Sequence, residues 1–418
     1  MVDARIAAAG LCVGGTSRHD PLKDMLTTRR AIFGLVLFLI AVTALCRVKK
    51  PSTEDHTIST SWHDLYSDFL PDGALSTTSR LNISLPTLSS QSPSTSGTHR
   101  KALISGHLST ENVTWLHTSL PAADSISFFL YTFDDRSAPL HPPRNKGREA
   151  MVYLTFIIDH YTSLPEIMLF MHAHRTAWHN ADVLGNDAVQ MIRRLNTNRV
   201  VREGYMNLRC QWFPGCPDWM HPLATEVDVQ KKEQVLMKSA WEELFPGVLV
   251  PETLAQPCCS QFAVSRDAVR SVPLEQWVAW RQWLLDTWLD SAFSGRVWEY
   301  IWQYVFTGES VMCPVEHVCY CDGFGVCFGG RERYEAWQAT RRERDRLSHE
   351  VDLWDAQEWE AAREEGEERG WTRPDDGRKA EMEREIDRLQ LLMSEQVKEA
   401  IERGNDPKNR EMETGIAY

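Results

Sequence analysis

The clearest pattern of apolar and polar positions lies at residues 167–180, which read IMLFMHAHRTAWHN. The apolar run Ile167–Met171 has the length of a buried strand, and polar residues follow it directly. Alternate residues of a strand point to the same face, so His172 and His174 are expected to project together. Ligands of open α/β sheets bind at this carboxyl edge. The pattern therefore predicts a metal or anion site, or alternatively hydrogen-bonded structural histidines around a buried turn.

The segments before this strand alternate between predicted strands and predicted helices. Ala102–Ser105 and Ser125–Phe133 are predicted as strands, the second because it is rich in aromatic and β-branched residues. Gly147–Tyr161 carries apolar residues at helical spacing. This order predicts an α/β fold of the Rossmann-like kind, with a mixed or mostly parallel sheet and flanking helices.

After the central strand the pattern is mainly helical. Helices are predicted at Asp187–Leu195, Lys231–Leu244, Leu274–Trp288 and Gly295–Phe306, and Pro257–Val269 is predicted to be a short strand that leads into a helix at Ser265. The tryptophans of the last two of these helices are interpreted as core residues. Glu299 lies on such an apolar helix, where a charged group needs a partner.

Residues 331–418 form a charged tail that is predicted to be largely helical. Ile386, Leu389, Met393 and Ala400 follow the heptad spacing of a coiled coil, although only for a few turns. The 418-residue chain has a net charge of −13, and the acidic tail contributes much of it. We interpret the tail as a solvated appendage that offers a surface to a protein partner. Nucleic acid is not expected as a partner, because no basic stripe stands out.

The N-terminal region predicts membrane anchoring. Residues 1–30 are predicted to be a cytosolic tail, residues 31–47 a transmembrane signal anchor and residues 48–100 a disordered stem rich in Ser, Thr and Pro. The apolar run Ala31–Cys46 is slightly short for a typical bilayer, which suits the thinner early secretory membranes. A cleaved signal peptide is the alternative, but the segment before the run is long for one.

Cysteines and glycosylation motifs favour a lumenal location for everything after the span. Eight of the ten cysteines follow it, and an even number of clustered cysteines is typical of an oxidising compartment. The acceptor motifs at Asn82 and Asn112 also follow it. We therefore expect a single-pass type II membrane protein of the Golgi or endoplasmic reticulum, with a lumenal α/β domain at residues 101–330.

Most of the eight lumenal cysteines are expected to be oxidised. Cys210 and Cys216 are close enough in sequence to close a small ring, whereas adjacent Cys258 and Cys259 are each expected to pair outward. The four cysteines of the stretch VMCPVEHVCYCDGFGVCFGG are expected to pack together against the domain. A zinc knot is the alternative for them, although the usual C-x-x-C pairs are absent.

Several long motifs resemble one family. The sequences NKGREA, HAHRTAWHN, NLRCQWFPGCP, PCCSQFAVSR, SGRVWEYIWQYVF and CYCDGFGVCFGG together resemble the fungal domain of unknown function 3431 family, over roughly Ile104–Gly330. These motifs are specific because they are long and rich in rare residues. The resemblance carries no established activity with it.

A weaker resemblance is to glycosyltransferases of the GT-A type. The order of tail, anchor, stem and lumenal domain is similar to theirs, as are a strand-end acidic pair, the QFAVSR element and a late acidic residue. Those enzymes place Asp-x-Asp at the end of a central strand to hold Mn²⁺ and a nucleotide diphosphate. His172-Ala173-His174 takes that place here, and imidazole suits zinc better than manganese.

Three functional hypotheses follow. In a glycosyltransferase-like enzyme, Glu299 and Asp135 are the expected catalytic residues, and Asp134, Arg175 and Arg266 are expected to contact a sugar nucleotide. In a metal-dependent hydrolase, His172, His174 and His179 are expected to hold a divalent metal with one open position for water. The third hypothesis is a non-catalytic membrane protein that binds a partner. A functional cleft is expected at the carboxyl edge of the sheet, with Glu299 facing it. The residues expected to line it are Asp134, Asp135, His172, His174, Arg175 and His179.

Overall fold

The structure is a computed structural model, and it describes residues 99–120, 126–364 and 377–418. Side chains are described over the same ranges except at 358–364. The predicted cytosolic tail at residues 1–30, the Ala31–Cys46 span and nearly all of the predicted stem lie outside the described residues. Within the described part, no helix combines the length and the apolar character that crossing a bilayer requires.

Five strands form one mixed sheet within the described residues, in the order β2-β1-β3-β5-β4. The strands are β1 Lys101–His107, β2 Ile126–Thr132, β3 Ile167–Phe170, β4 Tyr205–Asn207 and β5 Phe262–Ser265. Strand β1 pairs in parallel with both β2 and β3, whereas β5 runs antiparallel to its neighbours β3 and β4. The predicted mixed α/β sheet is therefore confirmed.

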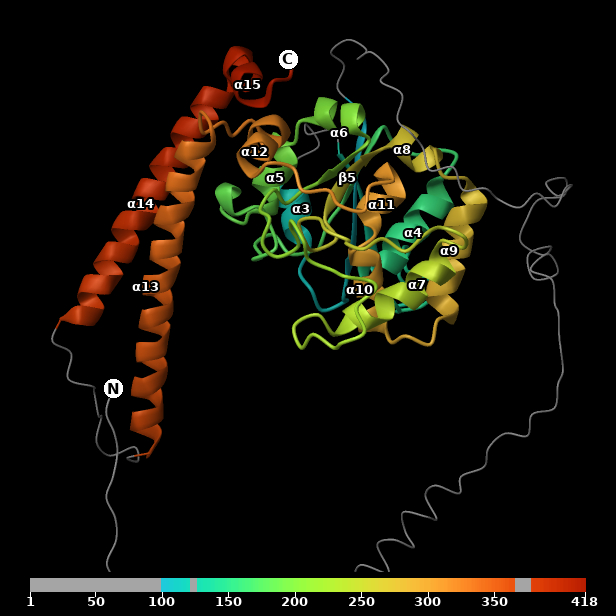
Figure 1. Ribbon diagram of the computed structural model, residues 1–418, viewed down its shortest axis with the longest axis horizontal. Coiled ribbons are helices and arrows are strands. Elements are labelled where there is room, and N and C mark those ends of the chain that lie inside the picture. Colours follow the sequence, from blue (N-terminus) through green and yellow to red (C-terminus); the bar gives the residue numbers. More distant parts are fainter. Residues whose placement is uncertain (1–98, 121–125, 365–376) are drawn as a thin grey trace, which may run out of the picture. The chain divides into compact units, whose positions relative to one another are not determined.

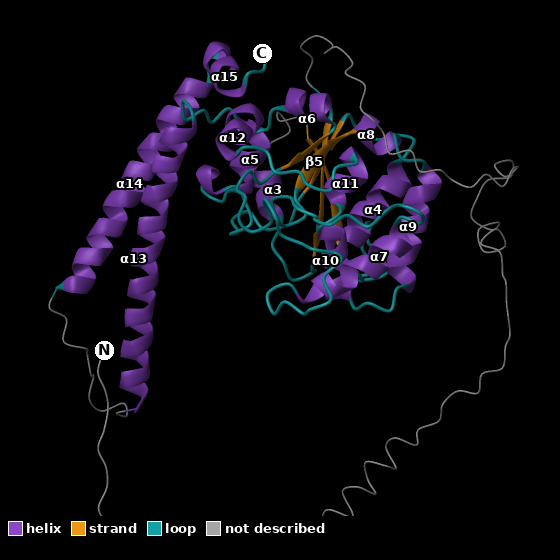
Figure 2. Ribbon diagram, in the orientation of Figure 1, coloured by secondary structure: helices purple, strands orange, loops and turns teal. Residues whose placement is uncertain are grey.

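Successive strand residues point to opposite faces, and each face is covered by its own apolar layer. Met168 and Phe170 pack into one cluster, and Ile167 and Leu169 pack into the other. Figure 2 shows the strands between two groups of helices. The first face is covered by α4 Glu149–His160, α7 Met237–Leu244, α8 Arg266–Arg270, α9 Leu274–Asp286, α10 Ser291–Glu299 and α11 Trp302–Thr307. The second is covered by α3 Thr114–Ser119, α5 Ala188–Arg194, α6 Thr197–Glu203 and α12 Glu316–Phe324.

The tryptophans of the predicted helices pack in or against the core, as expected, except Trp288, which is 79% exposed and lies beyond the end of α9. Two of those helices are also divided. The predicted helix Gly295–Phe306 consists of α10 and α11, with a break at Tyr300 and Ile301. The predicted helix Lys231–Leu244 begins as a 3₁₀ turn, η3 Lys232–Leu236, before α7. A second short 3₁₀ turn, η2 Asp182–Leu184, precedes α5. The first break places Glu299 at the end of α10.

The charged tail forms α13 Arg331–Glu364, α14 Arg378–Gly404 and α15 Pro407–Thr414. Helices α13 and α14 lie side by side (Figure 1) and share a small apolar core that includes Leu347, Trp354 and Leu389. The tail is not wholly a solvated appendage, however. Tyr334 and Trp337 of α13 are buried with residues of the second face of the sheet. Charged residues dominate its sequence, so only the few aromatic positions indicate this packing.

Candidate functional site

The carboxyl ends of β1, β2 and β3 meet at one edge of the sheet because these strands are parallel. His172 follows the end of β3, and Glu149 is the first residue of α4. Arg148, just before α4, has a φ of 51°, a conformation that costs energy for any residue with a side chain. The NKGR turn thus brings the start of α4 to the end of the central strand.

Glu149 and His172 form a largely buried ion pair. Nδ1 of His172 lies 3.1 Å from Oε1 of Glu149, and Nε2 lies 2.7 Å from the carbonyl oxygen of Cys259. Both partners are acceptors, so a ring that satisfies both must carry protons on both nitrogens. Burial would lower the pKa of His172, but the Glu149 carboxylate and the Cys259 carbonyl raise it above 6.5. Burial would likewise raise the pKa of Glu149, but His172 lowers it to about 2. We therefore assign an imidazolium and a carboxylate.

The Cys259 peptide links this pair to Glu299. Its carbonyl accepts from His172, and its N–H donates to Oε1 of Glu299 at 2.9 Å. Burial raises the pKa of Glu299 above its usual value, although the N–H of Cys259 and the charge of His172 oppose the shift. Glu299 therefore lies near His172, on the other side of the Cys259 peptide, but it is not among the residues that line the cavity described below. The two glutamates have pKa values displaced in opposite directions, which is a common arrangement of acid and base groups.

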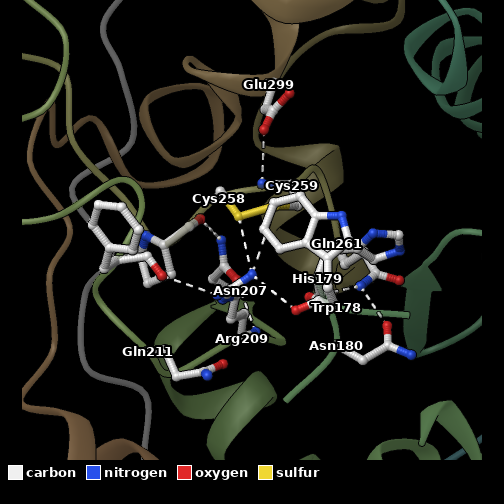
Figure 3. The surroundings of a disulfide bond; sticks show 12 residues. Trp178, His179, Asn180, Asn207, Arg209, Gln211, Cys258, Cys259, Gln261 and Glu299 are labelled. Atoms are coloured by element: carbon white, nitrogen blue, oxygen red, sulfur yellow. Dashed lines mark hydrogen bonds between the residues drawn. A yellow bond between two sulfur atoms is a disulfide. The ribbon is translucent and has the colours of Figure 1, made fainter. Parts of the chain in front are cut away.

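Cys258 and Cys259 form a disulfide with each other (Figure 3), with Cα atoms 3.7 Å apart. The prediction that each would pair outward is wrong. It rested on usual Cα separations, which exceed the distance between adjacent residues. Cys259 and Ser260 both have positive φ, at 91° and 51°. This turn presents the Cys259 carbonyl to His172 and its N–H to Glu299.

Gln261 is a site residue that the sequence patterns did not indicate. Its Oε1 accepts the backbone N–H of His172 at 3.1 Å, and its Nε2 donates to Oδ1 of Asn180 at 2.9 Å. Because β5 is antiparallel to β3, the amino end of β5 lies at the site edge, with Phe262 opposite Phe170. The only signal in the sequence is its place between the two cysteines and the strand.

Arg266 lies at the opposite edge of the sheet, so its predicted contact with a cofactor at this site is wrong. Its backbone N–H donates to the carbonyl of Glu166, the residue before β3, and its side chain approaches Asp267. The prediction assumed that β5 ends where β3 ends. The antiparallel register places Ser265 opposite Ile167 instead.

A polar cavity of about 250 Å³ opens beside the ion pair. His172, His174, Glu149, Glu111, Asn145 and Arg148 are among the residues that line it. His174 is exposed and its Nε2 lies 3.0 Å from Oε1 of Glu111. His172 and His174 thus face the same cavity, as the strand pattern predicted.

The three histidines do not assemble as a set of metal ligands. Both ring nitrogens of His172 are engaged by acceptors, and His174 is paired with Glu111. The ring of His179 packs 4.3 Å from that of His172, and burial, with the positive charge of His172, lowers the pKa of His179 to about 3. Among the described residues, the group that meets the geometry of a metal site is instead Cys321, Cys327 and Glu413, whose cysteines are joined in a disulfide.

The remaining predicted residues lie outside this cavity. Asp134 accepts hydrogen bonds from the backbone and hydroxyl of Ser109, and Asp135 does the same with Ser137. Arg175 pairs with Asp187 across 3.2 Å. Asp135 is satisfied within its own turn, whereas the partners of Asp134 and Arg175 come from other segments. None of the three has a partner in the cavity, so the acidic pair and Arg175 are not part of the assembled cluster.

The other six cysteines after residue 100 are also paired, which confirms the expectation of extensive oxidation. The disulfides are Cys210–Cys319, Cys216–Cys313 and Cys321–Cys327. Cys210 and Cys216 therefore do not close a ring with each other. They attach the loop after β4 to the segment around α12, across sequence separations of 109 and 97 residues.

Comparison with known proteins identifies the family alone. The family described as protein of unknown function (DUF3431) matches residues 103–322, which is more than half of the chain. No curated protein and no solved structure matches the chain. The matched segment contains most of β1, the ion pair, the adjacent cysteines and Glu299. The chain belongs to the domain of unknown function 3431 family.

Proposed function

We propose that this chain is a glycosyltransferase-like enzyme that transfers a sugar from a nucleotide donor to a hydroxyl group, with Glu299 as the base. The observation that supports this most is the arrangement of Glu149, His172 and Glu299 around the Cys259 peptide. It combines one strongly acidic carboxylate, one imidazolium and one carboxyl group with a raised pKa.

The reaction requires a base for the acceptor hydroxyl and positive charge for the leaving group. Glu299 takes the hydroxyl proton while the acceptor oxygen forms a bond to the anomeric carbon. The bond from that carbon to the donor phosphate breaks, and the electron pair leaves with the phosphate oxygen. A raised pKa makes a carboxylate a stronger base near neutral pH.

The cavity supplies the charge that a departing diphosphate needs. Arg148 is exposed beside the cavity and makes no ion pair with any other described residue, and His172 is an imidazolium. Donors fixed in place before the reaction stabilise developing negative charge. The cavity is smaller than the ~300–1,000 Å³ of sites for drug-sized ligands, which suits a single sugar residue.

The test is a turnover assay on the purified full chain. Nucleoside diphosphate release is measured from UDP- and GDP-sugars with hydroxyl acceptors, with and without Mg²⁺ or Mn²⁺. Glu299→Gln is expected to lower turnover by roughly 10²–10⁴-fold, as loss of a general base does. Glu309→Gln is the matched control, because Glu309 is exposed and follows α11. Turnover that survives in Glu299→Gln, or absence of binding to every donor, would contradict the proposal.

We further propose that the domain is lumenal and membrane-anchored through residues 31–47. The four disulfides of the described part support an oxidising compartment. Asn112 of one acceptor motif is exposed, as a glycosylated residue must be. Glycosidase treatment of the expressed chain is expected to change its mobility, and Asn112→Gln is expected to remove part of that change. A chain with no glycosidase-sensitive mobility would count against this topology.

A further inference from the structure

A second and larger cavity, of about 830 Å³, lies between the loop after β4, the start of α12 and the first turns of α13. It shares no lining residue with the cavity beside Glu149. Its lining combines arginines with the rings of Trp178, Trp212 and Phe213. Two of these rings are unusually exposed for their size, with Trp178 at 65% and Phe213 at 76%. Exposed aromatic rings beside cations are typical of a surface that receives a ligand.

Arg209 is the central cation of this cavity. It is only 4% exposed, yet among the described residues it forms no ion pair with a carboxylate. Its guanidinium donates to the carbonyl oxygen of Phe213 at 2.9 Å and to the sulfur of Cys258 at 3.3 Å. Its Nε is buried and makes no hydrogen bond with a described residue. Burial lowers the pKa of Arg209, but an arginine remains charged in proteins.

Carboxylates lie near Arg209, but none forms an ion pair with it. The charges of Asp182 and of Glu316, which also lines the cavity, raise the pKa of Arg209 and only partly offset the effect of its burial. The carboxylates of Glu335 and Asp345 pair with Arg331 and Arg341. Arg342 also lines the cavity, is exposed and makes no ion pair with any described residue. A buried charge that no carboxylate contacts directly is costly, so an anion that enters the cavity and pairs with Arg209 is stabilised.

The geometry also provides a stacking surface. The guanidinium carbon of Arg209 lies 5.3 Å from the ring centroid of Trp178, so the cation covers that ring (Figure 3). The indole remains largely exposed, which leaves it open to a flat ligand. A ring stacked on Trp178 would place an attached anionic group near Arg209.

From these observations we propose that this cavity binds a small ring compound that carries an anionic group, with Arg209 receiving the charge and Trp178 stacking on the ring. The proposal does not depend on glycosyl transfer at Glu299, because it concerns a separate cavity. Phosphate and carboxylate groups share the required chemistry, and the test below distinguishes between them.

The test measures dissociation constants by titration calorimetry on the full chain with phenyl phosphate, benzoate and phenol. Both anions are expected to bind more tightly than phenol, and phenyl phosphate more tightly than benzoate if the anion is a phosphate. Arg209→Gln is expected to weaken binding of the anions by about tenfold or more, because charge-assisted hydrogen bonds are lost. Trp178→Ala is expected to raise the dissociation constants of the same anions about three- to tenfold, because the stacking contact is lost.

Arg266→Gln is the matched control, because it removes an arginine at the opposite edge of the sheet and should leave binding unchanged. Arg342→Gln covers the case in which Arg209→Gln does not fold, since Arg342 is exposed. Arg342→Gln is expected to weaken the binding of phenyl phosphate and benzoate and to leave the binding of phenol unchanged. Phenol that binds as tightly as the anions, or anion binding that is unchanged in both Arg342→Gln and Trp178→Ala, would overturn the proposal.

Discussion

Oε1 of Glu149 lies 3.1 Å from Nδ1 of His172, and this contact joins the first residue of α4 to the end of the central strand. The side chains are mostly buried, at 24% and 18% exposure. In such surroundings an ion pair is only weakly screened by solvent. The pair therefore fixes the position of the site and also makes the stability of the domain depend on pH.

The first prediction concerns this pH dependence. The pKa of Glu149 is lowered from 4.5 to about 2 on folding, so its stabilisation is present above pH 4.5 and is lost as the pH falls toward 2. The pKa of His172 is raised above 6.5, so its stabilisation is present below that pH and is lost as the pH rises through the folded value. The pair should therefore stabilise the fold most between these two limits.

Urea unfolding of the full chain at pH 3, 5.5 and 8 checks this expectation. Glu149→Gln should lower the free energy of unfolding by roughly 3 kcal/mol at pH 5.5. It should also make that free energy depend less on pH. Glu111→Gln is the control, because it removes the carboxylate beside the exposed His174, where an ion pair contributes only ~0–1 kcal/mol. Equal losses in both variants would show that the buried pair has no special role.

The second prediction is the pattern of disulfides. Peptide mapping under non-reducing conditions should recover Cys210 with Cys319, Cys216 with Cys313, Cys321 with Cys327 and Cys258 with Cys259. Replacing both Cys210 and Cys319 by Ser should destabilise the fold by about 2–4 kcal/mol, since that bridge closes a long loop. Recovery of Cys258 or Cys259 linked to a distant cysteine would contradict the structure.

The third prediction concerns the attachment of α13. Asp182, with a side chain only 5% exposed, pairs with Arg341 of α13 and accepts a hydrogen bond from the Tyr320 hydroxyl at 2.7 Å. Asp182→Asn removes the carboxylate charge and leaves the partly buried Arg341 without this partner. The free energy of unfolding is expected to fall by about 3 kcal/mol. Hydrogen exchange should show faster exchange in the first turns of α13.

The control for this experiment is Asp187→Asn, which removes the partner of the exposed Arg175 in the same region. Exchange in α13 should not change in that variant. If Asp182→Asn also leaves α13 fully protected, the apolar contacts of Tyr334 and Trp337 hold the helix without the ion pair.

The fourth prediction concerns Gln261, which is 1% exposed. Gln261→Leu leaves the backbone N–H of His172 and the side-chain oxygen of Asn180 without their present partners. Each unsatisfied buried group costs about 1–3 kcal/mol, so thermal unfolding should occur at clearly lower temperature. Gln230→Leu, at an exposed position, should leave the unfolding temperature nearly unchanged. An equal fall in unfolding temperature in the two variants would show that the hydrogen bonds of Gln261 do not stabilise the site.

Much of the fold follows from the sequence, because apolar periodicity reports burial directly. The strand at Ile167–Phe170, the helix before it and the strand that leads into a helix at Ser265 all lie where the pattern predicts them. The motifs also identified the family, and Glu299 was singled out because it is a charge on an apolar helix. These features depend on residues that are close together in sequence, so the local sequence pattern is enough to predict them.

Tertiary structure alone decided which residues meet. The antiparallel direction of β5 brings Gln261 to the site and carries Arg266 away from it, although the two lie close in sequence. The partner of His172 is Glu149, which lies on another element, whereas Asp134 binds Ser109 and Asp135 binds Ser137. Strand direction and side-chain pairing depend on contacts between distant segments, and such contacts leave no periodic signal in one sequence.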